Sequence, residues 1–139
     1  MISQPSERTL NKVDVAKTQL DAAIQAYSRG EDIVAVTLAG AAEEIFGAIC
    51  CRQNIQNGVE KIAELPPLSV ISDNPKIRVA YLNAVRNCLK HANNRKEDVF
   101  VMTDLDSFVM IARALGNAML LGISDSETMS KFRNGEYRK

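Results

Sequence analysis

Apolar positions in the first third of the chain recur every three or four residues, which is the spacing of one face of an α-helix. This stripe consists of Val13, Ala16, Leu20, Ala23, Ile24 and Tyr27. Gly30 predicts that the helix ends near Arg29, because glycine readily adopts the left-handed conformation found at helix C-termini. Glu31 and Asp32 then favour the first turn of a second helix, where the helix dipole attracts carboxylates. The short break between the two helices predicts an antiparallel hairpin.

The second predicted helix, from about Asp32 to Gln53, is rich in small residues, which lets another backbone approach it closely. They are Ala35, Ala39, Gly40, Ala41, Ala42, Gly47 and Ala48. Glycine costs a helix interior about 1 kcal/mol relative to alanine, so Gly40 and Gly47 indicate a packing requirement. The pattern is compatible with a helix contact inside the chain or with a subunit interface.

Helical spacing fails over residues 57–75, which predicts a connecting loop with at most a short helical piece over 59–65. A third helix is predicted from Pro75, a residue favoured in a first turn, to the asparagines at 93 and 94. Its expected buried face consists of Ile77, Tyr81, Ala84, Val85, Cys88 and Ala92. Its opposite, solvent-facing side is expected to carry Asn83, Arg86, Asn87 and Lys90.

The segment after the third helix is predicted to be a loop that Val99, Phe100 and Val101 hold against the core. Thr103 and Asp106 form an approximate capping box that begins a fourth helix, which ends before Gly122. Its apolar face is expected to consist of Leu105, Phe108, Val109, Ala112, Leu115, Met119 and Leu120. A second capping box, formed by Ser124 and Glu127, predicts a short fifth helix in the tail.

The expected fold class is therefore all-α, an antiparallel four-helix bundle with a short fifth helix. A chain of 139 residues is the size of one domain. The expected organisation is a flexible N-terminus over 1–11, a single helical domain over 12–122 and a C-terminal tail over 123–139.

The balance of charges and the number and spacing of the cysteines limit the classes of protein to which this chain can belong. The 17 basic and 17 acidic side chains cancel, which argues against a DNA-coating protein or a membrane-surface binder. One histidine and three cysteines without a CxxC pair do not form a zinc-binding pattern, so neither a metal nor another cofactor is expected. The N-terminal residues lack a signal-peptide pattern, and no uninterrupted apolar run approaches the ~20 residues of a membrane helix. Reduced thiols, no membrane and a cytoplasmic location are the resulting expectations.

Residues 75–96 contain no acidic side chain and include His91, the only histidine of the chain. The six basic residues of this segment are Lys76, Arg78, Arg86, Lys90, Arg95 and Lys96. On a helix, Arg86 and His91 lie about 140° apart, but the long arginine and the nearby helix end relax this separation. Asn87 lies one turn before His91 and is expected to hydrogen-bond its imidazole.

This combination of side chains suits cleavage of RNA without a metal. A histidine can take the proton of the ribose 2′-hydroxyl or deliver one to the leaving oxygen, while a guanidinium holds the phosphate. The requirement for a 2′-hydroxyl would restrict the reaction to RNA.

The segment R-N-C-L-K-H resembles the R-x-x-x-x-H motif of the HEPN superfamily, small helical domains of prokaryotic toxins, defence systems and RNA processing. The order of helices over about residues 12–122 is also similar. The resemblance implies a homodimer with a composite RNA site, in which Arg86, Asn87 and His91 are the catalytic candidates. Lys90, Arg95 and Lys96 are the expected nucleic-acid contacts. Many members of the superfamily are inactive or bind nucleotides or proteins instead, so enzymatic activity stays open.

Two other interpretations compete with a metal-independent endoribonuclease. In the first, Arg86 and Lys90 are solvated and His91 simply caps a helix, where a cation suits the dipole. In the second, the protein is a non-catalytic dimer or binds a partner, such as an antitoxin-like protein, through the small residues of the second helix. Glu43 is expected to form a structural ion pair with a cation such as Arg86 or Arg113, and Glu44 is expected to face solvent.

Overall fold

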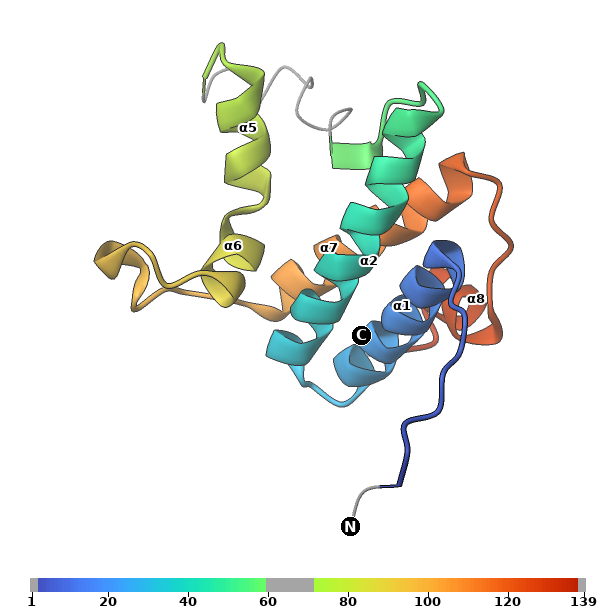
Figure 1. The fold of residues 1–139 in the computed structure, drawn as a ribbon. Helices are drawn as coiled ribbons and strands as arrows, with labels where there is room; N and C mark the ends of the chain where they lie inside the picture. Colours follow the sequence, from blue (N-terminus) through green and yellow to red (C-terminus); the bar gives the residue numbers. More distant parts are fainter. Residues whose placement is uncertain (1–2, 60–71, 138–139) are drawn as a thin grey trace.

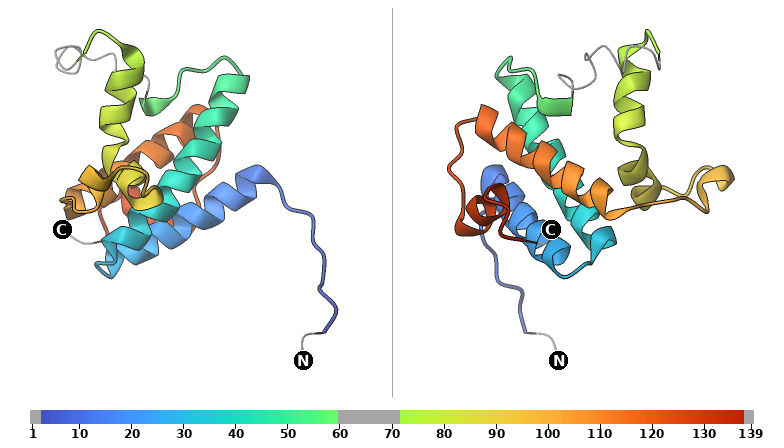
Figure 2. Two further views of the ribbon diagram at one scale, coloured as in Figure 1. Left: turned by 60° about the vertical axis from the view of Figure 1, so that its left-hand side comes forward. Right: turned by 180° about the vertical axis from the view of Figure 1, so that it is seen from behind.

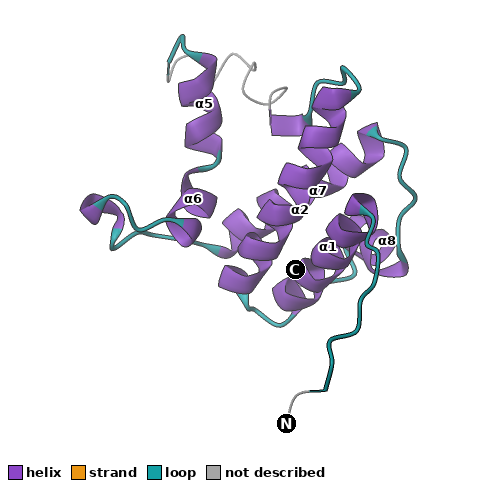
Figure 3. Ribbon diagram, viewed as in Figure 1, coloured by secondary structure: helices purple, strands orange, loops and turns teal. Residues whose placement is uncertain are grey.

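The computed structural model describes residues 3–59 and 72–137, and all regular secondary structure within these ranges is helical (Figures 1 and 3). Residues 3–11 are exposed and without regular structure. The predicted loop over 57–75 falls mostly on residues 60–71, outside the described part of the chain, as does most of the short helical piece expected within it.

Helices α1 (Lys12–Ser28) and α2 (Asp32–Arg52) form the predicted hairpin. Asn11 begins α1, because its side chain accepts a hydrogen bond from the Val13 amide at 2.8 Å. Gly30 ends the turn with a φ of 77°, a conformation that glycine adopts without strain. Both predicted helices and the break between them are therefore confirmed.

Helix α7 (Asp104–Leu120) packs across α1 and α2, and the short helix α8 (Glu127–Arg133) closes the core beside α1 (Figure 1). The predicted capping box of Thr103 and Asp106 is present. Helix α8 exists as predicted, but its cap is wrong: the Ser126 hydroxyl accepts from the Met129 amide, and Ser124 precedes the helix. The largest fully buried apolar side chains of this core are Phe46, Leu20, Ile24, Ile111 and Met129.

The third predicted helix is two helices, α5 (Pro75–Leu82) and α6 (Ala84–Lys90), joined at Asn83. Arg113 explains the interruption, because its guanidinium donates to the Leu82 carbonyl at 2.9 Å and to Asn83 Oδ1 at 2.6 Å. The helix also ends at Lys90 and not at residues 93–94. Helix α5 projects away from α1, α2 and α7 (Figures 1 and 2).

The expected burial of the third helix is wrong, since its polar side faces the core. Asn83 and Arg86 are the buried residues of 75–90, whereas Ile77 and Tyr81 are 51% and 60% exposed. Ala84 and Ala92 are exposed as well, and Val85 and Cys88 are only half-buried. The orientation follows from a carboxylate on α2 that accepts from Arg86 and from an arginine on α7 that donates to Asn83, as described below.

Two further apolar segments are more exposed than the sequence predicts. Val99 and Val101 are almost fully exposed and Phe100 partly so, and the loop contains a short 3₁₀ helix, η1 (Arg95–Glu97). Of the apolar face predicted for α7, Leu115 alone is buried. The buried side of α7 instead combines the large apolar Met110, Ile111 and Leu115 with small and polar residues, which are Ala114, Ala118, Ser107, Arg113 and Asn117.

Helix α2 is, by length and composition alone, apolar enough to cross a membrane, contrary to what the search for uninterrupted apolar runs indicated. It has 21 residues, and 56% of its most apolar window is buried inside the chain. Such burial is equally typical of the central core helix of a domain.

Candidate functional site

A buried carboxylate on α2 joins three helices. Glu43 accepts hydrogen bonds from Arg86 of α6 at 2.8 Å and from Arg113 of α7 at 3.2 Å. Arg86 binds Oε2 of the carboxylate and Arg113 binds Oε1, so each arginine has its own acceptor atom. The predicted structural role of Glu43 is confirmed, and it binds both of the arginines that the sequence suggested.

The three charged side chains are at least nine-tenths buried, with 3% of Glu43, 7% of Arg86 and 4% of Arg113 exposed. Burial lowers the pKa of Arg113 from its ordinary value, while the charge of Glu43 opposes this shift. Two cations share one buried carboxylate, so Glu43 is the anion on which the ordered position of both arginines depends.

Small residues on α2 make room for this cluster. A Cβ atom at Gly40 would lie 2.6 Å from Arg86 Cδ, so α6 can approach α2 here only because residue 40 is glycine. A Cβ atom at Gly47 would lie 3.4 Å from the side chain of Asn117, which donates to the Glu43 carbonyl and accepts from the Gly58 amide. Both glycines therefore face residues of the same chain, the first of the two explanations that the sequence left open, and at Gly40 a Cβ atom would overlap its neighbour.

The exposed rim of the cluster is formed by Glu44 and Lys90, and Glu44 also contacts the buried Arg86. Glu44 Oε1 lies 3.3 Å from Arg86 Nη2 and 3.4 Å from Lys90 Nζ. The Glu44 side chain is 46% exposed, as expected, but it is engaged by two cations of α6. Arg86 thus extends from the buried Glu43 to a carboxylate at the surface.

His91 occupies the C-cap position of α6 and is exposed. Its amide donates to the Asn87 carbonyl at 3.0 Å, and its backbone is extended, with φ −126° and ψ 145°. Within the described residues, no side-chain hydrogen bond joins Asn87 to the imidazole. The expected orientation of His91 by Asn87 is therefore not seen in the isolated chain.

Arg95 and Lys96 lie in η1, five residues beyond the end of α6, and both are exposed. The Asn94 side chain fixes the start of this turn by accepting from the Lys96 amide at 3.0 Å.

Partial burial raises the pKa of the Cys88 thiol and the charge of Glu97 adds to the rise, so this thiol is protonated at neutral pH. It is not a candidate nucleophile.

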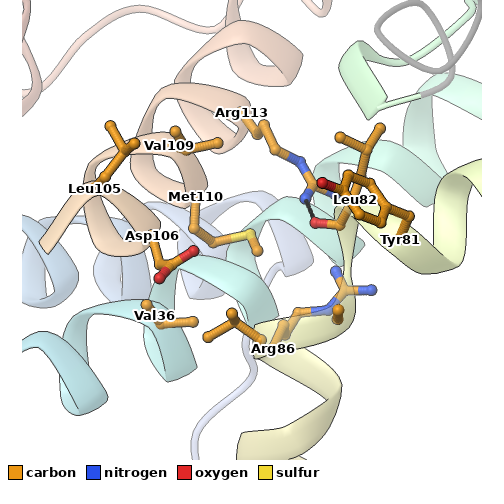
Figure 4. A pocket seen from close by; sticks show the side chains of 11 residues that line it. Val36, Tyr81, Leu82, Arg86, Leu105, Asp106, Val109, Met110 and Arg113 are labelled. Carbon is orange, nitrogen blue, oxygen red and sulfur yellow. Dashed lines mark hydrogen bonds between the residues drawn. The ribbon is translucent and has the colours of Figure 1, made fainter. Parts of the chain in front are cut away.

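A cavity of about 350 Å³ lies beside the cluster, between α5 and α6 on one side and α2 and α7 on the other. Arg86 and Arg113 meet at one side of it, close to Tyr81 and Leu82 (Figure 4). The remaining wall is mostly apolar and includes Met110.

The structure therefore brings Arg86 and Lys90 together through Glu44 and places His91 directly after Lys90, on the outside. Arg86 and His91 do not meet in one chain. The sequence analysis missed the roles of Asn83 and Asn117; the detectable signal was a polar pair, Arg113 and Asn117, one turn apart in an otherwise apolar helix.

No family model, no curated protein and no solved structure matches this chain.

Proposed function

We propose that this protein is a HEPN-like four-helix domain that binds RNA at the C-terminal end of α6 and cleaves it without a metal. The observation that carries the proposal is the exposed His91 with the exposed cations Lys90, Arg95 and Lys96 close to it in the chain. The side chains of His91, Arg95 and Lys96 have no hydrogen-bond or ion-pair partner among the described residues. They are therefore available to a polyanion.

In the proposed reaction, the His91 imidazole takes the proton of a ribose 2′-hydroxyl, and the oxygen attacks the adjacent phosphorus. The bond from phosphorus to the 5′-oxygen breaks, leaving a 2′,3′-cyclic phosphate. Lys90, Arg95 and Lys96 hold the backbone, and Arg86 stabilises charge on the reacting phosphate. Asn87 orients the imidazole once RNA is bound.

A dimer would supply what one chain lacks. The reaction needs a base for the 2′-hydroxyl and an acid for the leaving oxygen, and each chain has one histidine. Two chains facing each other across α6 would supply both. A self-association surface is available, because Tyr81 on α5 and Leu105 and Val109 on α7 are exposed apolar side chains.

The same exposed apolar side chains favour a second candidate function, non-catalytic association with a second copy or with an antitoxin-like protein. Binding through Gly40 and Gly47 is not part of this candidate, since contacts inside the chain occupy both. For either function we infer a cytoplasmic protein outside the membrane. Cys50, Cys51 and Cys88 form no disulfide among the described residues, and 56% of the most apolar window of α2 is buried, and both observations support that location.

The test is cleavage of a fluorescent single-stranded RNA in the presence of EDTA, with a DNA of the same sequence as a second substrate. We expect RNA products ending in cyclic phosphate and no cleavage of DNA. His91→Ala should reduce the rate about 10²- to 10⁴-fold, the usual contribution of general acid–base catalysis. The exposed position of His91 predicts an unchanged circular dichroism spectrum.

Asn93→Ala is the matched control, because Asn93 is exposed in the same loop. It should leave the rate unchanged. Full activity of His91→Ala, or equal cleavage of RNA and DNA, would rule out the catalytic role of His91. Binding of RNA without cleavage by the wild-type protein would leave an RNA-binding domain, and neither binding nor cleavage would leave the association function.

A further inference from the structure

We propose that the Glu44 carboxylate occupies the position of an RNA phosphate and that RNA binding displaces it. This inference rests on the proposed function and assigns the regulation of the same site. Glu44 Oε1 is bound by Arg86 Nη2 and Lys90 Nζ together, at 3.3 and 3.4 Å. A non-bridging phosphate oxygen between the same two donors would make equivalent charge-assisted hydrogen bonds.

The charges of the site support the exchange. With Glu43 and Glu44 against Arg86, Arg113 and Lys90, the five side chains carry a net charge of +1. Moving the Glu44 carboxylate into solvent leaves two positive charges, and one phosphodiester restores the original net charge. Glu43 stays bound to Arg86 throughout and keeps the guanidinium in place.

The free-energy cost of moving the Glu44 carboxylate into solvent is also small. Glu44 and Lys90 are 46% and 40% exposed, so solvent already screens their ion pair. Glu43 cannot be displaced in this way, because its side chain is 4% exposed and its removal would leave the buried Arg113 without a carboxylate and Arg86 with the exposed Glu44 alone. Of the two carboxylates, Glu43 and Glu44, it is thus Glu44 that a phosphate can replace.

A mostly apolar groove beside Glu44 lies between the start of α1 and the second half of α2 and has a cation from each helix. It has a volume of about 450 Å³, and Lys12 and Arg52 lie among the residues that line it, together with Glu44. When Glu44 is displaced, a backbone bound at Lys90 could continue along this groove between two further cations. The positive charges of Lys12 and Arg52 would also increase the rate at which an anionic strand reaches the site.

The test is the affinity of Glu44→Gln for a fluorescein-labelled 2′-O-methyl uridine decamer, which RNA cleavage cannot destroy. Fluorescence anisotropy is measured over a range of KCl concentrations. We expect about three- to fivefold tighter binding, since an exposed ion pair is a modest competitor. The slope of log affinity against log salt should stay nearly the same, because the wild type makes the same phosphate contact once Glu44 is displaced.

Glu127→Gln on α8 is the matched control, because it removes the same charge from an exposed i,i+4 pair with Lys131 on another part of the surface. It should change neither affinity nor slope. Lys90→Met in the Glu44→Gln background should abolish the gain. If wild type binds and Glu44→Gln binds no better, or if Glu127→Gln improves binding equally, the displacement is wrong while the RNA-binding function stands. If neither wild type nor Glu44→Gln binds, both are wrong.

Discussion

The charge state of a single residue, Glu43, determines how the polar interior of this protein is arranged. Its carboxylate accepts from Arg86 and Arg113, and each guanidinium is more than nine-tenths buried. A buried ion pair contributes little over an apolar replacement of all its members, yet breaking one is costly, because the remaining charge stays buried. Here one carboxylate serves two cations, which increases that cost.

Glu43→Ala should therefore lower the free energy of unfolding by up to about 3–5 kcal/mol, the usual cost of orphaning a buried charge. Urea unfolding followed by circular dichroism measures the change. Glu127→Ala, which removes an exposed carboxylate, is the control and should have little effect. Comparable midpoints for the two variants would contradict the structural role assigned to Glu43.

Sequence periodicity predicted some elements well and others poorly, for identifiable reasons. Helices α1, α2 and α7 were predicted because each is long, and because Gly30 and Gly122 mark the ends of α1 and α7 locally. The third helix was oriented wrongly, because the pattern shows that two faces differ but not which one faces the core. The orientation of Arg86 depends on Glu43, 43 positions earlier in the chain.

The candidate site was predictable to a similar extent. The ion pair of Glu43 followed from a carboxylate between small apolar residues, and His91 at a helix end followed from the asparagines after it. The burial of Arg86 did not, since an arginine on a basic, acid-free segment is usually solvated. Local composition carries no information about a counter-charge on another helix.

Gly40 of α2 and Gly116 of α7 should respond to alanine in opposite ways. A methyl group at Gly40 would overlap Arg86 Cδ, whose guanidinium is fixed by Glu43, so Gly40→Ala should cost about 1–3 kcal/mol, as overpacking does. Nothing lies within 4 Å of a Cβ atom at Gly116, so Gly116→Ala should stabilise by about 0.5–1 kcal/mol through helix propensity. Thermal and urea unfolding of both variants test this contrast, and effects of the same sign would refute it.

At the scale of the whole molecule, the apolar surface predicts self-association. Leu105 and Val109 lie one turn apart on α7 and are 64% and 40% exposed. Light scattering coupled to gel filtration should give the mass of a dimer for the wild type and of a monomer for the double variant Leu105→Glu, Val109→Glu. The exposure of both residues predicts that the variant remains folded.

Leu10→Glu provides the control for general surface charge, because Leu10 is 61% exposed but lies in the N-terminal extension before α1. It should remain dimeric. A monomeric wild type at tens of micromolar, or dissociation by Leu10→Glu alone, would remove the support for a composite site built from two histidines.

Helices α5 and α6 are attached through Glu43 by polar contacts, so their attachment depends on temperature in a different way from the stability of the apolar core. Residues 75–90 bury Asn83 and Arg86 but no apolar side chain. The apolar side chains Val79, Leu82, Val85, Cys88 and Leu89 are only half-buried, so detaching these helices exposes less apolar surface, and has a smaller heat-capacity change, than unfolding of the α1, α2 and α7 core. The free energy of unfolding of the core and the free energy of detaching α5 and α6 therefore depend on temperature with different curvature. We expect α5 and α6 to detach at a different temperature from that at which the core unfolds, and not in a single cooperative transition.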